Sequence, residues 1–422
     1  MAAMSTRQKL IDLSTPAFIV NRHAFRQNCE LVRTSANANG IHRLRLHVKT
    51  HKTREGCLIQ SGIRGDDGGG GVPAQASVIG FVVSTLPELS MVADLACHHQ
   101  CRPFSDILYG IPICKSKLSA IYSLKMKLAS ATNNDGSIHI LIDNPGQVNF
   151  LEEFISNSSL PERDWSVFLK LDTGYHRAGT TCNAEGVALA KKIINSPYLN
   201  LKGLYSHCGH SYNIDNGAEM KNIVHDDHAV IIEFLNLLAD HLQTFDTSSL
   251  DISVGSTPSM FSHEKMNIPN NVELHPGNYV FYDRQQLYTG ACANESCVAG
   301  FVLARVMGHY EDSHRNAIMV DAGATALTKE VTPQGDMCAV FGRPELECYR
   351  MSQEVTMIRC RDGTPFPFDN FPLGSTILLL PNHSCLAAAC FDVYHVVDED
   401  GERPFSTDSE IVDTWKPAKG WT

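Results

Sequence analysis

The first two-thirds of the chain alternates short apolar runs with longer amphipathic segments. Each apolar run has the length of a β-strand and ends at polar or turn-forming residues. Regular alternation of strands with helices predicts a parallel sheet, and eight such strands predict a closed βα (TIM) barrel of roughly 250 residues. The eight predicted strands are residues 44–48, 79–83, 106–109, 138–143, 167–172, 201–207, 250–255 and 272–274.

Five of the intervening segments carry apolar residues at helical spacing. The clearest is 226–243, where a residue of every turn is apolar. Its apolar positions are Val230, Ile231, Phe234, Leu235, Leu238 and Leu242. The remaining predicted helices are 21–33, 117–130, 145–156 and 184–195.

The rhythm changes near Gly300, where strand-like runs follow one another with few long helical segments between them. These runs are 300–307, 316–322, 354–361 and 375–380. Runs of strands after a βα region predict a separate β-rich domain. We therefore predict an α/β protein with a barrel domain at 15–285 and a β-rich C-terminal domain at 286–422 that also takes in residues 1–14.

The composition is that of an ordinary globular protein. Of its 422 residues, 43% are hydrophobic and 19% charged, and the net charge of -11 argues against nucleic acid as a partner. We find no apolar run of membrane-spanning length and no apolar segment in MAAMSTRQKL. Fourteen cysteines without a C-x-x-C pair are typical of reduced thiols. We expect a cytoplasmic protein that does not bind a membrane.

Lys49 lies in Leu-His-Val-Lys-Thr-His-Lys-Thr at 46–53, where the first predicted barrel strand gives way to polar residues. Barrel enzymes place their chemistry at the C-terminal ends of the strands. A lysine there can form a Schiff base with an aldehyde cofactor. The alternative is a solvated basic loop that follows a strand.

A second polar segment, Asp172-Thr-Gly-Tyr-His-Arg-Ala-Gly179, directly follows another predicted strand. Its glycines allow the backbone to turn sharply and approach a ligand. Tyr175 and Arg177 would then lie at the barrel mouth, where an arginine can bond a phosphate, a carboxylate or a ring nitrogen. The alternative is a turn with solvent-facing side chains.

Two further motifs have ligand-binding chemistry. Val254-Gly-Ser-Thr-Pro258 ends a strand in a turn of small residues with N–H groups and hydroxyls, which suits a phosphate. In Pro381-Asn-His-Ser-Cys385, an extended backbone would place His383 and Cys385 on one face as a pair of zinc ligands. A buried cysteine beside a loop histidine is the alternative, and so is a structural zinc completed by distant ligands.

Taken together, the motifs resemble the eukaryotic D-serine dehydratase family, whose members are fold type III, alanine-racemase-like pyridoxal-phosphate enzymes. The resemblance spans nearly the whole chain, and its motifs keep the family's order. HVKTHKT with PNHSC is specific, whereas neither GSTP nor DTG would suffice. The motifs are TPA at 15–17, HVKTHKT at 47–53, VSTL at 83–86, DILYG at 106–110, DTGYHRAG at 172–179, GSTP at 255–258, HPGNY at 275–279, PNHSC at 381–385 and EIVDTW at 410–415.

The resemblance implies a homodimeric lyase that uses pyridoxal 5'-phosphate and zinc to convert D-serine to pyruvate and ammonia. Lys49 matches the Schiff-base lysine, which would also remove the α-proton, whereas Lys52 does not match it. His383 and Cys385 match zinc ligands that would activate the β-hydroxyl. The remaining cofactor positions implied by the match are Gln147, Tyr175, Arg177, Tyr205, His207, Gly255, Ser256, Thr257 and Tyr279.

Two other functions remain open. A D-threonine or 3-hydroxyaspartate aldolase of the same fold would also use a metal, but the resemblance implies a carboxylate in such enzymes where this chain has Cys385. A non-catalytic pyridoxal-phosphate carrier would need only a barrel and no metal, so the β-rich domain with PNHSC argues against it. The preference among D-3-hydroxy amino acids depends on pocket shape, which the sequence leaves open.

Overall fold

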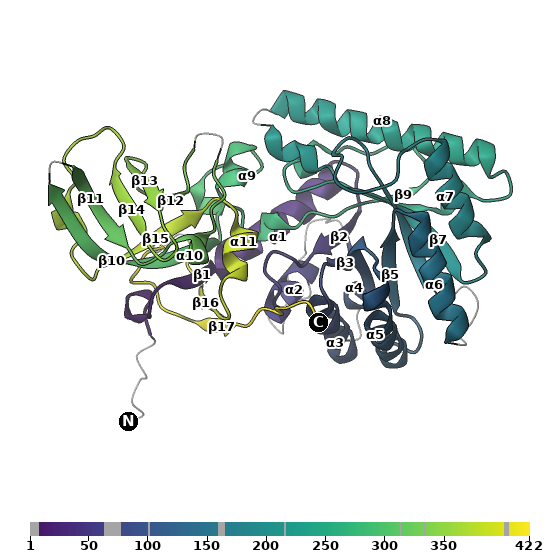
Figure 1. Cartoon of the computed structure of the whole chain (residues 1–422), viewed down its shortest axis with the longest axis horizontal. Helices are drawn as coiled ribbons and strands as arrows, with labels where there is room; N and C mark the ends of the chain where they lie inside the picture. Colours follow the sequence, from purple (N-terminus) through teal and green to yellow (C-terminus); the bar gives the residue numbers. More distant parts are fainter. Residues whose placement is uncertain are drawn as a thin grey trace. The chain divides into compact units, whose positions relative to one another are not determined.

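The computed structural model describes residues 8–62, 77–99, 102–158, 165–214, 217–312, 314–332, 335–400 and 405–422 (Figure 1). The chain divides into two compact units. Unit 1 combines Met1–Cys29 with Asn278–Pro417, and unit 2 combines Glu30–Gly277 with Ala418–Thr422.

Unit 2 is a closed barrel of eight parallel strands (Figure 1). Each strand pairs with the next along the chain, and β2 pairs with β9 through Leu44 and Leu274 to close the ring. All eight strands that the apolar runs predict are present, so the predicted barrel is confirmed. The strands are β2 (Arg43–His47), β3 (Ser77–Val83), β4 (Asp106–Pro112), β5 (Ser137–Ile142), β6 (Trp165–Leu171), β7 (Leu199–Ser206), β8 (Asp251–Val254) and β9 (Asn271–Leu274).

The predicted helices are also present, with ends set by local capping. At α6, Pro145 fixes the first turn, the Asn144 side chain accepts from a backbone N–H, and Gln147 completes a capping box. The helix over 226–243 begins earlier than its apolar pattern predicts. The helices along this part of the chain are α1 (Arg22–Ala38), α2 (Arg54–Ser61), α3 (Leu86–His99), α4 (Arg102–Ser105), α5 (Leu118–Ala131), α6 (Pro145–Asn157), α7 (Ala184–Asn195) and α8 (Gly217–His241).

The barrel interior is a packed core. One buried cluster joins side chains from five consecutive strands: Val82, Leu108, Leu141, Phe168 and Tyr205. Because successive side chains of a strand alternate between its two faces, residues two apart in β2 or β9 share the same face. This alternation stacks the interior in layers, and a layer of charged residues underlies the candidate site described below.

Unit 1 is a mixed, largely antiparallel sheet. Its main path runs β13-β14-β11-β10-β1-β16-β17, and β15 pairs with both β10 and β12. β1 pairs antiparallel with β10 and parallel with β16. The β-rich second part is therefore confirmed. Its strands are β1 (Ala17–Asn21), β10 (Gly300–Asp312), β11 (Arg315–Val320), β12 (Cys338–Val340), β13 (Leu346–Met351), β14 (Thr356–Cys360), β15 (Thr376–Pro381), β16 (Tyr394–Val397) and β17 (Asp413–Trp415).

Three short helices belong to unit 1: α9 (Arg284–Tyr288), α10 (Ala324–Leu327) and α11 (Ser384–Ala389). α11 begins three residues after β15 ends, so the Pro381–Cys385 motif turns from strand to helix. The extended backbone considered for this motif holds only as far as His383, which has φ -137° and ψ 100° and precedes the helix.

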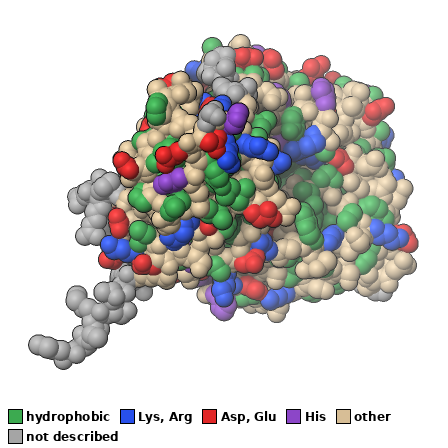
Figure 2. Space-filling view, turned by 60° about the vertical axis from the view of Figure 1, so that its left-hand side comes forward, with side chains coloured by type: hydrophobic (Ala, Val, Ile, Leu, Met, Phe, Trp, Pro, Cys, Tyr) green, Lys and Arg blue, Asp and Glu red, His purple; other side chains and the backbone are tan. Residues whose placement is uncertain are grey.

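On the face shown in Figure 2, acidic and basic side chains lie interspersed. In the part of the chain that the structure describes, no helix is both long enough and apolar enough to cross a membrane.

Candidate active site

Lys49 lies half-buried in the turn two residues beyond the end of β2. Its backbone N–H donates to Nδ1 of His47, 3.2 Å away. Its Cε atom lies 3.7 Å from the place that a Cβ on Gly277 would occupy, just beyond the end of the neighbouring strand β9. A Cβ at position 277 would also lie 3.0 Å from Cβ of His47, so glycine allows the end of β9 to approach β2 beside Lys49.

Lys52 has a different environment, although it belongs to the same motif. Its ammonium forms an ion pair with the buried carboxylate of Glu88. Glu88 also accepts from the backbone N–H of Ser84, 2.7 Å away, so this pair joins the segment after β2 to the start of α3. Lys52 therefore has a structural role in the pair with Glu88, whereas Lys49 lies beside Gly277.

Three histidines surround this mouth: His47 and His275, which are buried, and His207, which is half-buried. Burial, reinforced by nearby cations that include Lys49, lowers the pKa of each well below its ordinary value. All three are therefore neutral near pH 7 and present ring nitrogens and flat faces. The ring of His275 stacks on Tyr205 with centroids 4.2 Å apart, and His207 lies 6.1 Å from His275.

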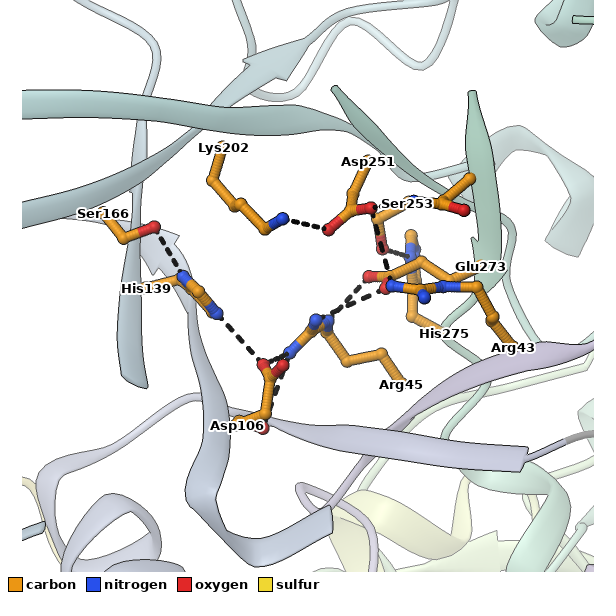
Figure 3. Close-up of polar contacts among 11 residues, drawn as sticks. Arg43, Arg45, Asp106, His139, Ser166, Lys202, Asp251, Ser253, Glu273 and His275 are labelled. Carbon is orange, nitrogen blue, oxygen red and sulfur yellow. Dashed lines mark hydrogen bonds and ion pairs between the residues drawn. The ribbon is translucent and has the colours of Figure 1, made fainter. Parts of the chain in front are cut away.

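His275 has one ring nitrogen that is open to a ligand. Nδ1 hydrogen-bonds the Ser253 hydroxyl at 2.9 Å, which fixes the plane of the ring (Figure 3). Nε2 is buried and has no hydrogen-bond partner among the described residues. A buried polar atom of this kind is costly unless something pairs with it. This unpartnered nitrogen makes the mouth of the barrel a candidate place for a polar group of a ligand.

Two cations lie over aromatic rings at the same end of the barrel. Nζ of Lys170 is 4.9 Å from the Tyr205 ring centre, and the Arg177 guanidinium is 4.7 Å from that of Tyr175. Burial first, and then the charges of Arg177 and Lys49, lower the pKa of Lys170 to about 8. These mutually repelling cations make the mouth suited to an anionic ligand.

The turn after β8 has the small, donor-rich character that the sequence predicts. Gly255 has a φ of +105°, which glycine adopts readily, and its carbonyl bonds the His207 ring at 3.2 Å. Ser256 and Thr257 are buried. The Thr257 hydroxyl accepts from the Gly277 backbone N–H at 3.2 Å, so the turn is joined to the end of β9.

A network of charged side chains connects the barrel strands near His275 (Figure 3). Arg45 is 1% exposed and reaches Glu273 at 2.6 Å and Asp106 at 2.5 Å. Burial opposes the charge on Arg45, but the two carboxylates outweigh it and raise its pKa. Asp106 also bonds His139 at 3.0 Å. Since Arg45 and Glu273 lie two residues before His47 and His275, the network supports the strands that carry the site.

His383 and Cys385 belong to unit 1 and contact each other across the start of α11. Nδ1 of His383 lies 2.8 Å from Oε2 of Glu330. Burial alone would lower the pKa of His383, but hydrogen bonds that the charged ring donates to Cys385 and Glu330 raise it to about 11. Within the described ranges, no group of three or more His, Cys, Asp or Glu side chains is arranged to hold a metal ion.

The remaining predicted residues fall into two groups. Tyr175, Arg177, Tyr205, His207 and the turn at 255–257 lie with Lys49 in unit 2, and Tyr175 packs edge-on against His207 with ring centroids 6.1 Å apart. Gln147 also lies in unit 2, where both ends of its side-chain amide bond Asp143 at the start of α6. Tyr279 is fully buried in a single helical turn, Asn278–Val280, of unit 1.

Sequence reasoning assigned no role to four residues of these sites: His47, Lys170, His275 and Glu330. A signal for three of them is visible in retrospect. His47, Lys170 and His275 are polar residues at or beside the C-terminal ends of apolar strands, which is where barrel enzymes gather their ligands. Glu330 has no such signal, because it lies in an irregular segment far from His383 in sequence.

Comparison with known proteins finds a family match for each of the two units. Residues 73–283 match the family model "Alanine racemase, N-terminal domain", and residues 299–397 match "Putative serine dehydratase domain". The chain is 31% identical to D-serine dehydratase of Dictyostelium discoideum, covering 97% of this chain and 98% of that protein. It is 33% identical to D-serine dehydratase of Schizosaccharomyces pombe, covering 96% and 92%.

The fold is also that of a solved relative. D-threo-3-hydroxyaspartate dehydratase from Delftia sp. superposes with a TM-score of 0.79 at 23% identity, over 98% of this chain and all of that one. The identities to the D-serine dehydratases, sustained over nearly the full length, confirm the resemblance that the motifs carry. The chain belongs to the D-serine dehydratase family of fold type III, alanine-racemase-like enzymes, and is a lyase.

Proposed function

We propose that this enzyme is a pyridoxal-phosphate- and zinc-dependent D-serine dehydratase that forms pyruvate and ammonia. The observation that carries the proposal is the position of Lys49, among three neutral histidines and two cations at the mouth of the barrel. The names of the relatives support D-serine as the substrate.

The residues at the mouth fit pyridoxal phosphate. An amine at Lys49 suits the aldehyde, and the turn at Gly255, Ser256 and Thr257 suits the phosphate. Nε2 of His275, which is buried and has no hydrogen-bond partner among the described residues, supplies a polar partner for the cofactor. When bound, pyridoxal phosphate supplies a conjugated ring that stabilises negative charge at the α-carbon of an amino acid.

Lys49 has two tasks in this proposal. Its amine holds the aldehyde before substrate arrives, and once released it removes the α-proton as general base. Lys170 and Arg177 attract the carboxylate of the substrate to the mouth, because a bound anion relieves the repulsion between their positive charges. The pKa values of the three histidines are lowered, so these rings do not compete for the proton near pH 7.

The unit 1 residues fit a zinc ion with open positions. A histidine and a cysteine in contact are suitable zinc ligands, and two protein ligands leave room for a substrate oxygen. A carboxylate on the second ring nitrogen of a ligating histidine is a common orienting partner, and Glu330 occupies that place. When bound, zinc supplies Lewis acidity that makes the substrate hydroxyl a better leaving group.

The chemical balance is simple. Loss of the α-proton and of the β-hydroxyl removes one water from D-serine and leaves aminoacrylate, which water converts to pyruvate and ammonia. The same residues could instead serve cleavage of the Cα–Cβ bond, as in the D-threonine aldolase of Arthrobacter, but that protein is only 22% identical to this chain. The higher identities favour dehydration.

The central test is pyruvate release from D-serine and L-serine, with and without a metal chelator. We expect pyruvate from D-serine but not from L-serine. The chelator should abolish this activity, and added zinc should restore it. Glycine from D-threonine would instead indicate the aldolase, and faster turnover of D-threo-3-hydroxyaspartate would redefine the substrate. Absence of pyruvate from D-serine with both cofactors added would contradict the proposal.

The roles of individual residues can be separated in the same preparation. Lys49→Ala should lose the visible absorbance of the lysine-bound cofactor. Cys385→Ala should keep that absorbance and lose pyruvate formation. Mass spectrometry after borohydride reduction should locate the pyridoxyl group on Lys49, and its location on Lys52 would refute the assignment.

We also propose that the enzyme is a cytoplasmic homodimer, as the family resemblance implies. Sedimentation of the purified enzyme should give twice the chain mass of 46.5 kDa. A fluorescent fusion should localise to the cytoplasm. A monomer that has full activity would contradict the dimer.

A further inference from the structure

A line of hydrogen bonds runs from helix α8 to the turn after β8, and the proposed mechanism does not use it. Nε2 of His228 lies 2.9 Å from Nδ1 of His263, and Nε2 of His263 lies 3.2 Å from the Ser259 hydroxyl. Ser259 in turn lies 2.9 Å from the hydroxyl of Ser256. All four residues belong to unit 2.

The direction of this line follows from counting hydrogens. The Ser211 hydroxyl lies 2.6 Å from the Cys208 carbonyl, which can only accept, so the single Ser211 hydrogen is used there. The 2.8 Å bond between Ser211 and Ser256 must then be donated by Ser256. Ser259, whose contacts on Ser256 include a carbonyl at 3.4 Å, donates toward Ser256, while the Cys208 thiol, which also bonds Ser259, has a hydrogen of its own to donate.

This count settles the tautomer of His263. Since the Ser259 hydrogen is used at Ser256, the bond between Ser259 and His263 is donated by Nε2–H of the imidazole. Nδ1 of His263 therefore accepts, and Nε2–H of His228 donates to it. Burial lowers the pKa of His263 to about 3 and that of His228 to about 4, which keeps both rings neutral as this count requires.

His263 acts on the turn at two points. Its Nε2 lies 3.0 Å from the place that a Cβ on Gly255 would occupy, so the ring packs against the turn directly. Through Ser259 it also acts on Ser256, whose backbone N–H donates to the Ser259 hydroxyl at 3.1 Å. Ser259 and His263 are fully buried, so water does not compete for these bonds.

From this arrangement we infer that His263, backed by His228, is a positioning residue for the phosphate group of the cofactor. The inference rests on the proposed function, in which the Gly255–Thr257 turn holds that phosphate. Donation from His263 through Ser259 polarises the Ser256 hydroxyl, because hydrogen bonds in a chain strengthen one another. Ser256 can then turn its hydrogen from Ser211 to a phosphate oxygen, while Ser211 keeps its bond to the Cys208 carbonyl.

The test compares two cofactors that differ only in the phosphate. Pyridoxal phosphate and pyridoxal are each titrated into wild-type and variant apoenzyme, followed by the absorbance of the lysine-bound aldehyde. His263→Leu removes both ring nitrogens at similar size. We expect this variant to lower the affinity for pyridoxal phosphate about tenfold, which corresponds to the loss of one or two buried hydrogen bonds. The affinity for pyridoxal should stay unchanged.

Two further variants guard against an unspecific effect. His263→Gln keeps a donor and an acceptor and should recover most of the affinity for pyridoxal phosphate. His241→Leu removes an exposed histidine of α8 that bonds a carbonyl of its own helix at 2.9 Å, and it should match wild type for both cofactors. Equal weakening of both cofactors by His263→Leu, or no weakening of either, would overturn the inference.

A second measurement needs no variant to fold. Nitrogen-15 spectra of histidine-labelled apoenzyme should show His263 as the Nε2–H tautomer, neutral at pH 5. An Nδ1–H tautomer would overturn the inference even if cofactor binding were normal. Wild-type enzyme that binds neither cofactor through Lys49 would overturn the proposed function, and this inference with it.

Discussion

Nδ1 of His383 lies 2.8 Å from Oε2 of Glu330, so Glu330 occupies one ring nitrogen of the histidine and not the other, Nε2. A carboxylate in this position fixes the tautomer and increases the basicity of a ligating imidazole. Glu330 is itself held by the Gln285 side chain at 3.3 Å. The contact makes Glu330 a determinant of zinc affinity in the proposed enzyme.

Removal of this carboxylate should therefore weaken zinc binding. We expect Glu330→Ala to lower zinc affinity by about 10- to 100-fold, and Glu330→Gln, which keeps an acceptor, to lower it less. Competition with a chromogenic chelator measures the affinity without reference to turnover. Glu345→Ala is the matched control, since Glu345 is an exposed carboxylate that pairs with Arg343. Unchanged affinity in Glu330→Ala would refute the orienting role.

The lowered pKa of Lys170 makes the stability of the cofactor-free enzyme depend on pH. Between about 8, its pKa in the folded chain, and 10.5, its ordinary value, the unfolded chain binds a proton that the folded chain does not. Stability therefore rises with pH through this interval, and the cost of burying the charge is fully present below pH 8.

Lys170→Met should accordingly be more stable than wild type at pH 7, by about 3 kcal/mol. The difference should shrink as the pH approaches 10.5. Urea unfolding of the apoproteins at pH 7, 9 and 10.5 measures it, and Lys191→Met, on the exposed side of α7, controls for loss of a lysine. A difference that stays constant with pH would contradict the expected burial of the Lys170 charge.

Removing one partner of the buried Arg45–Glu273 ion pair should destabilise the enzyme more than removing both partners. Arg45→Met leaves the fully buried Glu273 without its cation and should destabilise the enzyme by about 3–5 kcal/mol. Arg45→Met with Glu273→Leu should recover part of that loss, because the buried Glu273 charge is gone while Asp106 keeps its contact with His139. Lys127→Met, which breaks the exposed pair with Asp94, should cost about 0–1 kcal/mol. Similar losses from the buried and the exposed pair, in chemical denaturation, would argue against this account.

Gly255 should tolerate no side chain. In Gly255→Ala the new Cβ would lie 3.0 Å from Nε2 of His263, at a φ that disfavours other residues. We expect weaker pyridoxal phosphate binding and a loss of stability of about 1–2 kcal/mol. Gly290→Ala provides a comparison, because Gly290 also has a positive φ but has nothing within 4 Å of the added atom. If both variants bound the cofactor equally well, the close approach at Gly255 would be unimportant.

The barrel could be predicted because its signals are local. A buried parallel strand is a continuous apolar run, and each run here ends where the chain turns. The start of α6 shows the same agreement, with Asn144, Pro145 and Gln147 each favouring a helix at that point. The placement of Lys49 just beyond β2 followed from the same local pattern.

The features that could not be predicted depend on contacts between distant segments. Arg45 pairs with Glu273 only because β2 and β9 close the ring, and no local pattern encodes that register. Glu330 contacts His383 for a similar reason. At Cys385 the metal pair was argued for the case of an extended backbone, whereas Ser384 begins a helix and bonds Asp283 through its backbone N–H at 2.8 Å.

The sheet of unit 1 joins segments from both ends of the chain, since β1 pairs with β10 and with β16. On the ribosome, residues 17–21 emerge early but must wait for residues 300–312 and 394–397 before either edge of β1 is paired. The barrel strands, all contained within 43–274, can close in the meantime. Vectorial synthesis should therefore complete the barrel first, and the nascent β1 is the segment whose unpaired edges need protection until translation ends.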